Sequence, residues 1–194
     1  VRLIGKVGDD PFGQIVSRLL AEESTDLTSG LVISPGGATS YSVVINPPHL
    51  DRTFLHMPGE NDTFGPEDLH PEVLSGASHL HFGYPPLMAR MFSHEGRELE
   101  ATLLRAKESG LTVSLDMSLP DPASPSGRAP WREILKRVLP LVDVFLPSQD
   151  ELAYMLGRSP EDLTGMAEEC LAMGCRLLVV KRGDKGLTAF SQQK

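Results

Sequence analysis

Cysteine is nearly absent from this sequence. Among 194 residues only Cys170 and Cys175 carry thiols, and no histidine lies near them in the chain. Disulfide-stabilised domains and zinc sites need several cysteines or histidines at close spacing, so the sequence suggests neither. We interpret both cysteines as small apolar residues of a helix and of the turn that follows it.

An excess of positive charge and long apolar runs are lacking too. The chain has 18 basic and 26 acidic residues, a formal net charge of −8, and no cluster of Lys and Arg. Nucleic acid is therefore not an expected partner. No apolar run approaches the roughly 20 residues of a membrane helix, and no secretory signal is present, so we expect no membrane association and a cytoplasmic location.

Three common catalytic motifs are also missing. The sequence contains no Gly-x-x-x-x-Gly-Lys-Ser/Thr loop, no Gly-x-Ser-x-Gly elbow and no His-Glu-x-x-His pair. A P-loop nucleotide site, an α/β-hydrolase nucleophile and a zinc protease centre therefore have no support.

What the sequence does contain is an alternation of apolar strand and helix patterns. Strands are predicted at residues 2–7, 77–82, 111–115, 142–146 and 176–181. Helices are predicted from Pro11, with Asp10 as the N-cap, at 95–109, at 131–139 and after 159–162. Alternating strands and helices predict an α/β fold, a Rossmann-like αβα domain with a mostly parallel sheet covered on both faces. With 40% hydrophobic residues, one domain spanning residues 1–194 is expected.

A β-rich segment interrupts this alternation. Residues 39–45 and 53–57 have strand character, and the Pro-rich loop at 46–51 joins them. We predict an antiparallel hairpin, inserted at about residues 31–60, that acts as a small lid over a site.

Polar residues and glycines follow most of the predicted strands, where open parallel sheets bind ligands. They are Asp9, Gly83, Asp116, Ser148, Glu151, Lys181, Arg182, Gly183 and Gly186. Asp116 can hold a metal-bound water, orient a basic group or contact a substrate hydroxyl, but an Asx-turn or a cap explains it equally well. Glu151 can help to hold Mg²⁺ through water or can serve as a first-turn carboxylate.

Two other features keep simple structural explanations. Gly183 and Gly186 either allow a nucleotide to approach the backbone or form a tight turn between two strands. His79 and His81 alternate along one predicted strand without further metal-ligating residues, so we interpret them as ordinary strand residues.

Four segments, in order along the chain, resemble the ribokinase-like (PfkB-type) carbohydrate kinase family. Residues 5–13, GKVGDDPFG, are similar to its G-x-V-G-x-D-x-F-G segment, and residues 58–61, PGEN, to its G-A-N segment. Residues 143–151, DVFLPSQDE, are similar to D-x-x-x-x-N-x-x-E, with Ser148 in place of the usual Asn. Residues 179–186, VVKRGDKG, are similar to the v-v-x-x-G-x-x-G nucleotide segment.

The resemblance implies ATP-dependent phosphorylation of a sugar hydroxyl, with Mg²⁺, and a homodimer formed through the lid. The implied sugar-binding residues are Asp9, Tyr41, His56, Gly83 and Asp116; those for ATP are Ser148, Lys181, Arg182, Gly183 and Gly186; Glu151 is implied for Mg²⁺. The family's catalytic Asp, in its G-A-G-D segment, is expected beyond Lys194, so this chain is expected to be incomplete and inactive alone. A nucleoside kinase of the same family and a non-catalytic ligand-binding or regulatory domain are the alternatives.

Overall fold

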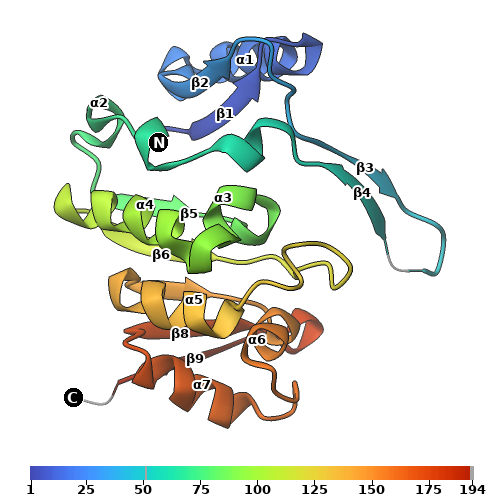
Figure 1. Cartoon of the computed structure of the whole chain (residues 1–194), viewed down its shortest axis with the longest axis vertical. Helices are drawn as coiled ribbons and strands as arrows, with labels where there is room; N and C mark the ends of the chain where they lie inside the picture. Colours follow the sequence, from blue (N-terminus) through green and yellow to red (C-terminus); the bar gives the residue numbers. More distant parts are fainter. Residues whose placement is uncertain (51, 193–194) are drawn as a thin grey trace. The chain divides into compact units, whose positions relative to one another are not determined.

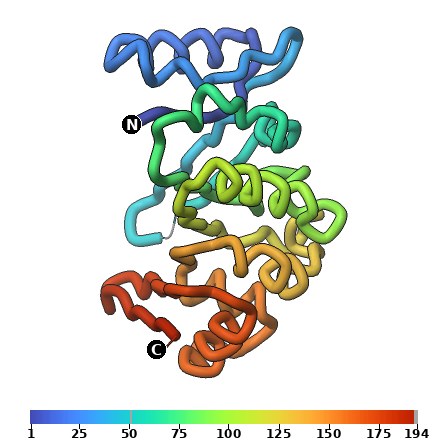
Figure 2. The backbone as a smooth tube through the Cα atoms, turned by 90° about the vertical axis from the view of Figure 1, so that its left-hand side faces the viewer, coloured from blue at the N-terminus to red at the C-terminus, as the bar shows by residue number. Residues whose placement is uncertain are grey.

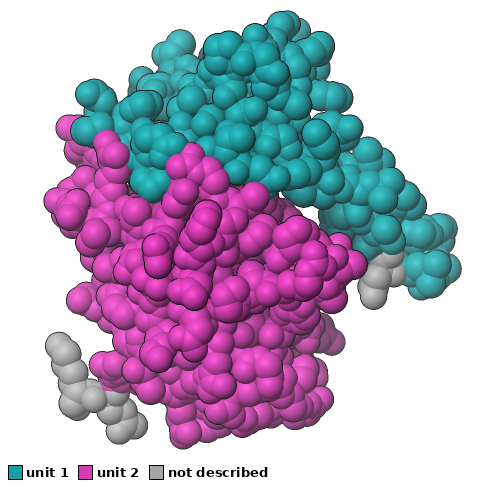
Figure 3. Space-filling model, viewed as in Figure 1, with its two compact units in different colours: residues 1–73 teal, residues 74–194 magenta. Residues whose placement is uncertain are grey.

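The computed structural model describes residues 1–50 and 52–192, which form two compact units. Unit 1 comprises Val1–Val73 and unit 2 begins at Leu74 (Figure 3). Asp51, at the end of the predicted hairpin loop, and Lys194 lie outside the described residues. The short helix α2 (Pro71–Leu74) spans the division in the sequence, and no helix of the described part is long and apolar enough to cross a membrane.

Unit 1 is built on two parallel strands and one helix. Strand β1 (Ile4–Gly8) pairs in parallel with β2 (Gly30–Ser34), and α1 (Pro11–Glu23) connects them through the 3₁₀ turn η1 (Thr25–Thr28). The predicted start of α1 is confirmed: Asp10 is the N-cap, its Oδ1 accepts a hydrogen bond from the Gly13 amide at 2.8 Å, and Pro11 occupies the first turn.

The hairpin of unit 1 is narrower than the predicted lid. Strands β3 (Tyr41–Ile45) and β4 (Thr53–Met57) pair antiparallel, as predicted, with Tyr41 opposite Met57 and Ile45 opposite Thr53. The segment from Leu31 to Ser34, which lies within the predicted lid, belongs to β2 and pairs with β1. Two 3₁₀ segments, η2 (Gly59–Thr63) and η3 (Pro66–Asp68), follow the hairpin.

Unit 2 contains a five-stranded sheet in sequence order (Figure 1). Strands β5 (His79–Phe82), β6 (Thr112–Asp116), β7 (Val144–Leu146) and β8 (Leu177–Lys181) are parallel, whereas β9 (Leu187–Ser191) pairs antiparallel with β8. The helices are α3 (Ala89–Phe92), α4 (Arg97–Glu108), α5 (Trp131–Val138), α6 (Gln149–Leu156) and α7 (Leu163–Ala172), with 3₁₀ turns η4 (Pro85–Leu87), η5 (Ser93–Gly96), η6 (Leu139–Leu141) and η7 (Gly183–Lys185). The mostly parallel α/β architecture is therefore confirmed.

The helices of unit 2 cover one face of its sheet, not both as predicted. Strand order follows chain order, so right-handed crossovers place every connecting helix on the same side. The helices form one layer in both views (Figures 1 and 2). On that side the sheet buries Leu80, Phe82, Val113, Leu115, Phe145, Leu178 and Val180. On the other side His79, His81 and Thr112 are exposed within the described chain.

The cysteines are core residues, as interpreted from the sequence. Cys170 lies in α7 and Cys175 follows it, and both side chains are free and buried. Burial raises the pKa of the Cys170 thiol to about 12 and that of Cys175 to about 11. Because the thiolate is the reactive form, both groups are inert at neutral pH.

Asp143 links three elements at the amino end of the sheet. Its Oδ2 accepts hydrogen bonds from Lys107 Nζ at 2.6 Å and from the Val113 amide at 2.8 Å, and its Oδ1 accepts one from Arg176 at 3.0 Å. Burial acts to raise the pKa of Asp143, but the bond from Lys107, the Val113 amide and the two positive charges outweigh it and hold the pKa below its ordinary value.

Replacing Asp143 by Asn is expected to lower the free energy of unfolding by about 1–2 kcal/mol, because it weakens charge-assisted hydrogen bonds. Since folding lowers the pKa of this carboxyl, its contribution is present above the pKa of the unfolded chain and is lost as the pH falls through the folded value. Urea unfolding of both proteins at several pH values tests this. A difference in stability that did not shrink on acidification would contradict the assignment.

Candidate active site

Three predicted site residues meet at the carboxyl edge of the unit 2 sheet. Asp116 is the last residue of β6, Ser148 follows β7 and caps α6, and Lys181 ends β8. The register places Asp116 opposite Leu146, and an isolated parallel bridge joins Ser148 to Lys181. The fold therefore brings together residues that are up to 65 positions apart in the chain.

Asp116 and Lys181 form a direct ion pair. Lys181 Nζ lies 2.5 Å from Asp116 Oδ1, which also accepts a hydrogen bond from the Met117 amide at 2.8 Å. The sequence assigned Asp116 to the sugar and Lys181 to the nucleotide. In the structure Asp116 orients a basic group, one of the alternatives that the sequence left open.

Ser148 and Glu151 form a reciprocal cap on α6. Glu151 Oε2 accepts a hydrogen bond from the Ser148 amide at 2.6 Å, and Ser148 Oγ accepts one from the Glu151 amide at 3.2 Å. Burial raises the pKa of Glu151, against the bond from the Ser148 amide and the positive charge of Lys181; the charge of Asp116 raises the pKa as well. Glu151 is thus a first-turn carboxylate, and its assignment to Mg²⁺ stays a prediction.

The described residues contain no group of three or more His, Cys, Asp or Glu side chains arranged to hold a metal ion. A magnesium ion at Glu151 would therefore take most of its ligands from water and from phosphate oxygens, which is how Mg²⁺ is commonly bound beside nucleotides. One partly buried carboxylate at the start of a helix fits that requirement.

Gly183 and Gly186 form the tight turn between β8 and β9. Both have positive φ, 57° and 78°, and the Arg182 amide donates to the Gly186 carbonyl at 2.8 Å. A Cβ atom at either glycine would meet nothing within 4 Å, so the turn also presents open backbone. Arg182 is held by Gln149 Oε1 at 3.1 Å. The turn explanation is confirmed, and space for a ligand remains.

The other predicted sugar-binding residues belong to different elements. Gly83 follows β5, in open surroundings, and the next amide, that of Tyr84, donates to the Asp116 carbonyl at 3.2 Å. In unit 1, Asp9 Oδ1 accepts a hydrogen bond from the Gly36 amide at 2.9 Å. Tyr41 packs against the Phe12 ring with centroids 5.2 Å apart, and His56 Nδ1 lies 2.8 Å from Ser42 Oγ. Their roles in sugar binding stay predictions.

Thr39 organises unit 1 and was missed by the sequence reasoning. Its buried hydroxyl accepts a hydrogen bond from the Gly8 amide at 3.0 Å and donates to Asp10 Oδ1 at 2.6 Å. The Thr39 hydroxyl is the main cause that holds the pKa of Asp10 below its ordinary value, followed by the Gly13 and Thr39 amides. The only signal in the sequence is a hydroxyl residue at the start of a predicted strand, which is too common to be informative.

The two histidines of β5 are joined by hydroxyl groups of β6. His79 Nδ1 lies 2.7 Å from Thr112 Oγ1, and Ser114 Oγ lies 2.8 Å from His79 Nε2 and 2.7 Å from His81 Nδ1. Thr112 Oγ1 donates its proton to the Ser78 carbonyl at 3.1 Å, so it must accept from His79. His79 then accepts at Nε2 from Ser114, which accepts from His81 Nδ1.

Both neutral histidines are therefore expected to carry their proton on Nδ1. Long-range proton–nitrogen NMR spectra at a pH where the rings are neutral identify the protonated nitrogen directly. Substitution of Ser114 by Ala removes the shared hydroxyl and should leave His81 free to exchange between its two tautomers. A proton on Nε2 of His79 in the unmodified protein would show that the deduced direction of these bonds is wrong.

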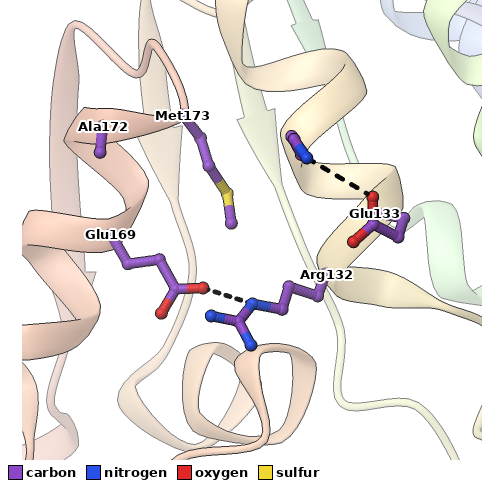
Figure 4. A pocket seen from close by; sticks show the side chains of 6 residues that line it. Arg132, Glu133, Glu169, Ala172 and Met173 are labelled. Carbon is purple, nitrogen blue, oxygen red and sulfur yellow. Dashed lines mark ion pairs between the residues drawn. The ribbon is translucent and has the colours of Figure 1, made fainter.

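A pocket among the helices lies apart from these residues (Figure 4). It is lined by Arg132, Glu133, Lys136, Glu169, Ala172 and Met173, from α5 and from the end of α7. Arg132 Nε pairs with Glu169 Oε1 at 2.6 Å, and Arg158 pairs with the other oxygen of Glu169. None of the predicted site residues lines this pocket, whose charges are paired with one another.

The fold and the carboxyl-edge residues define an α/β protein of the ribokinase-like kind, and the known proteins agree. The family model for pfkB family carbohydrate kinases matches residues 1–194. A fructokinase from Klebsiella pneumoniae is 33% identical over 191 residues, covering 96% of this chain and 59% of its own. A fructokinase structure from Xylella fastidiosa has a TM-score of 0.79 at 22% identity, covering 99% of this chain and 60% of that one. The chain therefore belongs to the pfkB family of carbohydrate kinases.

The chain thus spans about 59% of the length of that relative. A fructokinase from Vibrio cholerae, solved in a fructose, ADP and calcium ion bound form, has a TM-score of 0.77 at 23% identity and covers 100% of this chain and 60% of its own. The structural neighbours confirm the ribokinase-like fold that the sequence predicted.

Proposed function

We propose that the protein transfers the γ-phosphate of ATP to a hydroxyl group of a sugar, with Mg²⁺ as the metal ion. The observation that carries this proposal is the meeting of Asp116, Lys181 and the Ser148–Glu151 cap at one edge of the sheet, in a chain that belongs to a carbohydrate kinase family.

The residues of this edge have the chemistry that ATP requires. Lys181 and Arg182 supply positive charge for phosphate oxygens, and the open turn at Gly183 and Gly186 lets a nucleotide approach the backbone. Ser148 can contact phosphate directly or through water, and Glu151 can bind the water shell of Mg²⁺. The metal neutralises charge on the phosphates when it is bound.

We propose that Asp9, Tyr41 and His56, all of unit 1, contribute to sugar binding. Fructose is the first sugar to test, because the Klebsiella pneumoniae relative is a fructokinase. None of the residues assigned in this chain is proposed as the general base.

The test is to express the full-length gene product and to measure ADP formation with fructose, ribose, other common sugars and adenosine in the presence of MgATP. Turnover with a sugar supports the proposal. Turnover with adenosine and with none of the sugars would favour the nucleoside kinase alternative. Binding of ADP and sugar without any turnover would favour a ligand-binding or regulatory role.

We also propose that two copies of the chain form a homodimer through the β3–β4 hairpin. Its strands expose apolar side chains on both faces, namely Tyr41, Val43, Val44, Ile45, Phe54, Leu55 and Met57, each at least 41% exposed. Such a surface is typical of a contact site. Val43 and Leu55 face each other across the strands, so replacing both by Glu is expected to give a monomer in sedimentation experiments. Leu104 to Glu, on α4, is the control; an unmodified protein that sediments as a monomer would refute the dimer.

A further inference from the structure

The ion pair between Lys181 and Asp116 reaches across an intervening strand. In the sheet order β7 lies between β6, which carries Asp116, and β8, which carries Lys181. The Lys181 amide donates to the Pro147 carbonyl at 2.9 Å, immediately after β7, while its side chain extends to Asp116 Oδ1 at 2.5 Å. The ammonium group is thereby held over the carboxyl end of the middle strand.

This position is next to the start of helix α6. Ser148, the N-cap of α6, is bridged to Lys181, and the charge of Lys181 acts on Glu151 in the first turn. The amino end of a helix carries partial positive charge from its aligned peptide groups. A fixed ammonium beside it adds a second donor of positive charge at the same place, an arrangement that favours phosphate oxygens.

Asp116 is itself well fixed. It is the last residue of β6 and lies opposite Leu146, and its Oδ1 accepts a hydrogen bond from the Met117 amide. Its side chain is only 19% exposed, whereas that of Lys181 is 37% exposed. A lysine side chain has many rotamers, and ordering it costs entropy. A rigid carboxylate that selects one rotamer before the ligand arrives lowers that cost at binding.

We propose that Asp116 is a positioning residue that holds Lys181 for the nucleotide, and that it does not contact the sugar. This inference rests on the proposed function, because it assigns the ligand of Lys181 to the phosphates of ATP or ADP. Asp116 therefore acts on nucleotide affinity through Lys181.

The test compares Asp116→Asn, Lys181→Met and the double variant in the full-length gene product. ADP binding is measured by calorimetry, and KM is measured separately for ATP and for the sugar. Each single variant is expected to weaken ADP binding about tenfold, the factor that corresponds to one charge-assisted hydrogen bond. The double variant should be no weaker than the singles, because both remove the same interaction. The KM for the sugar should stay within about twofold.

Two controls accompany these variants. Lys181→Arg keeps a cation at the pair and should restore most of the ADP affinity, whereas Lys136→Met removes an exposed lysine of α5 and should change nothing. A measurement without ligand is the NMR signal of the Lys181 ammonium group, which should be visible in the unmodified protein, because the ion pair slows its exchange, and should vanish in Asp116→Asn.

The outcomes that would contradict the role of Asp116 differ from those that would contradict the kinase activity. An Asp116→Asn protein with a raised sugar KM and normal ADP affinity would overturn this inference and leave the kinase proposal standing, as would additive losses in the double variant. An unmodified protein that binds no nucleotide would overturn the proposed function, and this inference with it.

Discussion

Replacement of Gly8 by alanine is expected to destabilise unit 1 by about 3 kcal/mol, the upper part of the range for an overpacked site. An added Cβ would lie 2.1 Å from the Gly37 carbonyl oxygen, 2.5 Å from its carbon and 2.9 Å from the Ala38 amide nitrogen. These are backbone atoms, which cannot rotate away as a side chain can. The loop that carries the Gly36 amide, the partner of Asp9, would have to move.

Gly5, three positions earlier in the same strand, is the matched control. A Cβ atom there would meet only Leu31 Cδ1, at 3.9 Å, which is an ordinary contact. Gly5→Ala should be neutral or stabilising by about 0.5 kcal/mol, because alanine reduces the freedom of the unfolded chain. Chemical denaturation, with hydrogen exchange of the Gly8 and Thr39 amides to follow unit 1 alone, measures both variants. Equal stabilities for the two would show that the close approach of Gly8 and Gly37 is wrong.

Glu151→Gln is expected to raise the Mg²⁺ concentration needed for half-maximal activity about tenfold to a hundredfold, the range found when groups that support a bound metal are removed. The side-chain oxygen of glutamine can still accept a hydrogen bond from the Ser148 amide, so the capping box and the start of α6 should be preserved. Glu151→Ala removes both functions and should also cost about 1 kcal/mol of stability. The pair of variants separates the cap from the metal.

The measurements are Mg²⁺ titrations of activity and thermal unfolding over a range of pH. Burial raises the pKa of Glu151, so folding disfavours its ionised form. The stability that this carboxyl contributes is present at low pH and is lost as the pH rises through its pKa in the folded protein. Over that pH range the thermal stability of Glu151→Gln should therefore rise relative to that of the unmodified protein. If Glu151→Gln needed no more Mg²⁺ than the unmodified protein, Glu151 would be a helix cap alone.

Local features of this protein were predictable because neighbouring residues determine them. Strand β4 was predicted with its observed limits. The cap of α1 was predictable because the Asp10 side chain reaches an amide of its own helix. The turn at Gly183 and Gly186 was predictable because glycine readily adopts the positive φ that such a turn needs, and both residues have it. The collinear segments identified the family because their order depends on the sequence alone.

Features that depend on strand pairing were not predictable in the same way. Leu31–Ser34 and the hairpin strands are similar in composition, and alternation of side chains does not tell parallel from antiparallel pairing, so β2 was assigned to the lid. The hydrogen bonds among His79, Ser114 and His81 can be predicted only when the register of β5 against β6 is known. The pair of Asp116 and Lys181 needs the order of three strands, and each residue had been assigned to a different ligand.

The two ends of strand β6 have separate tasks. Val113, near its start, donates to Asp143, and Asp116, three residues on, holds Lys181, a separation of about 10 Å along an extended chain. Changes at sites this far apart are usually additive. The network around Asp143 and the pair of Asp116 and Lys181 can therefore be changed independently, the first affecting the stability of the fold and the second the carboxyl edge, where the nucleotide is proposed to bind.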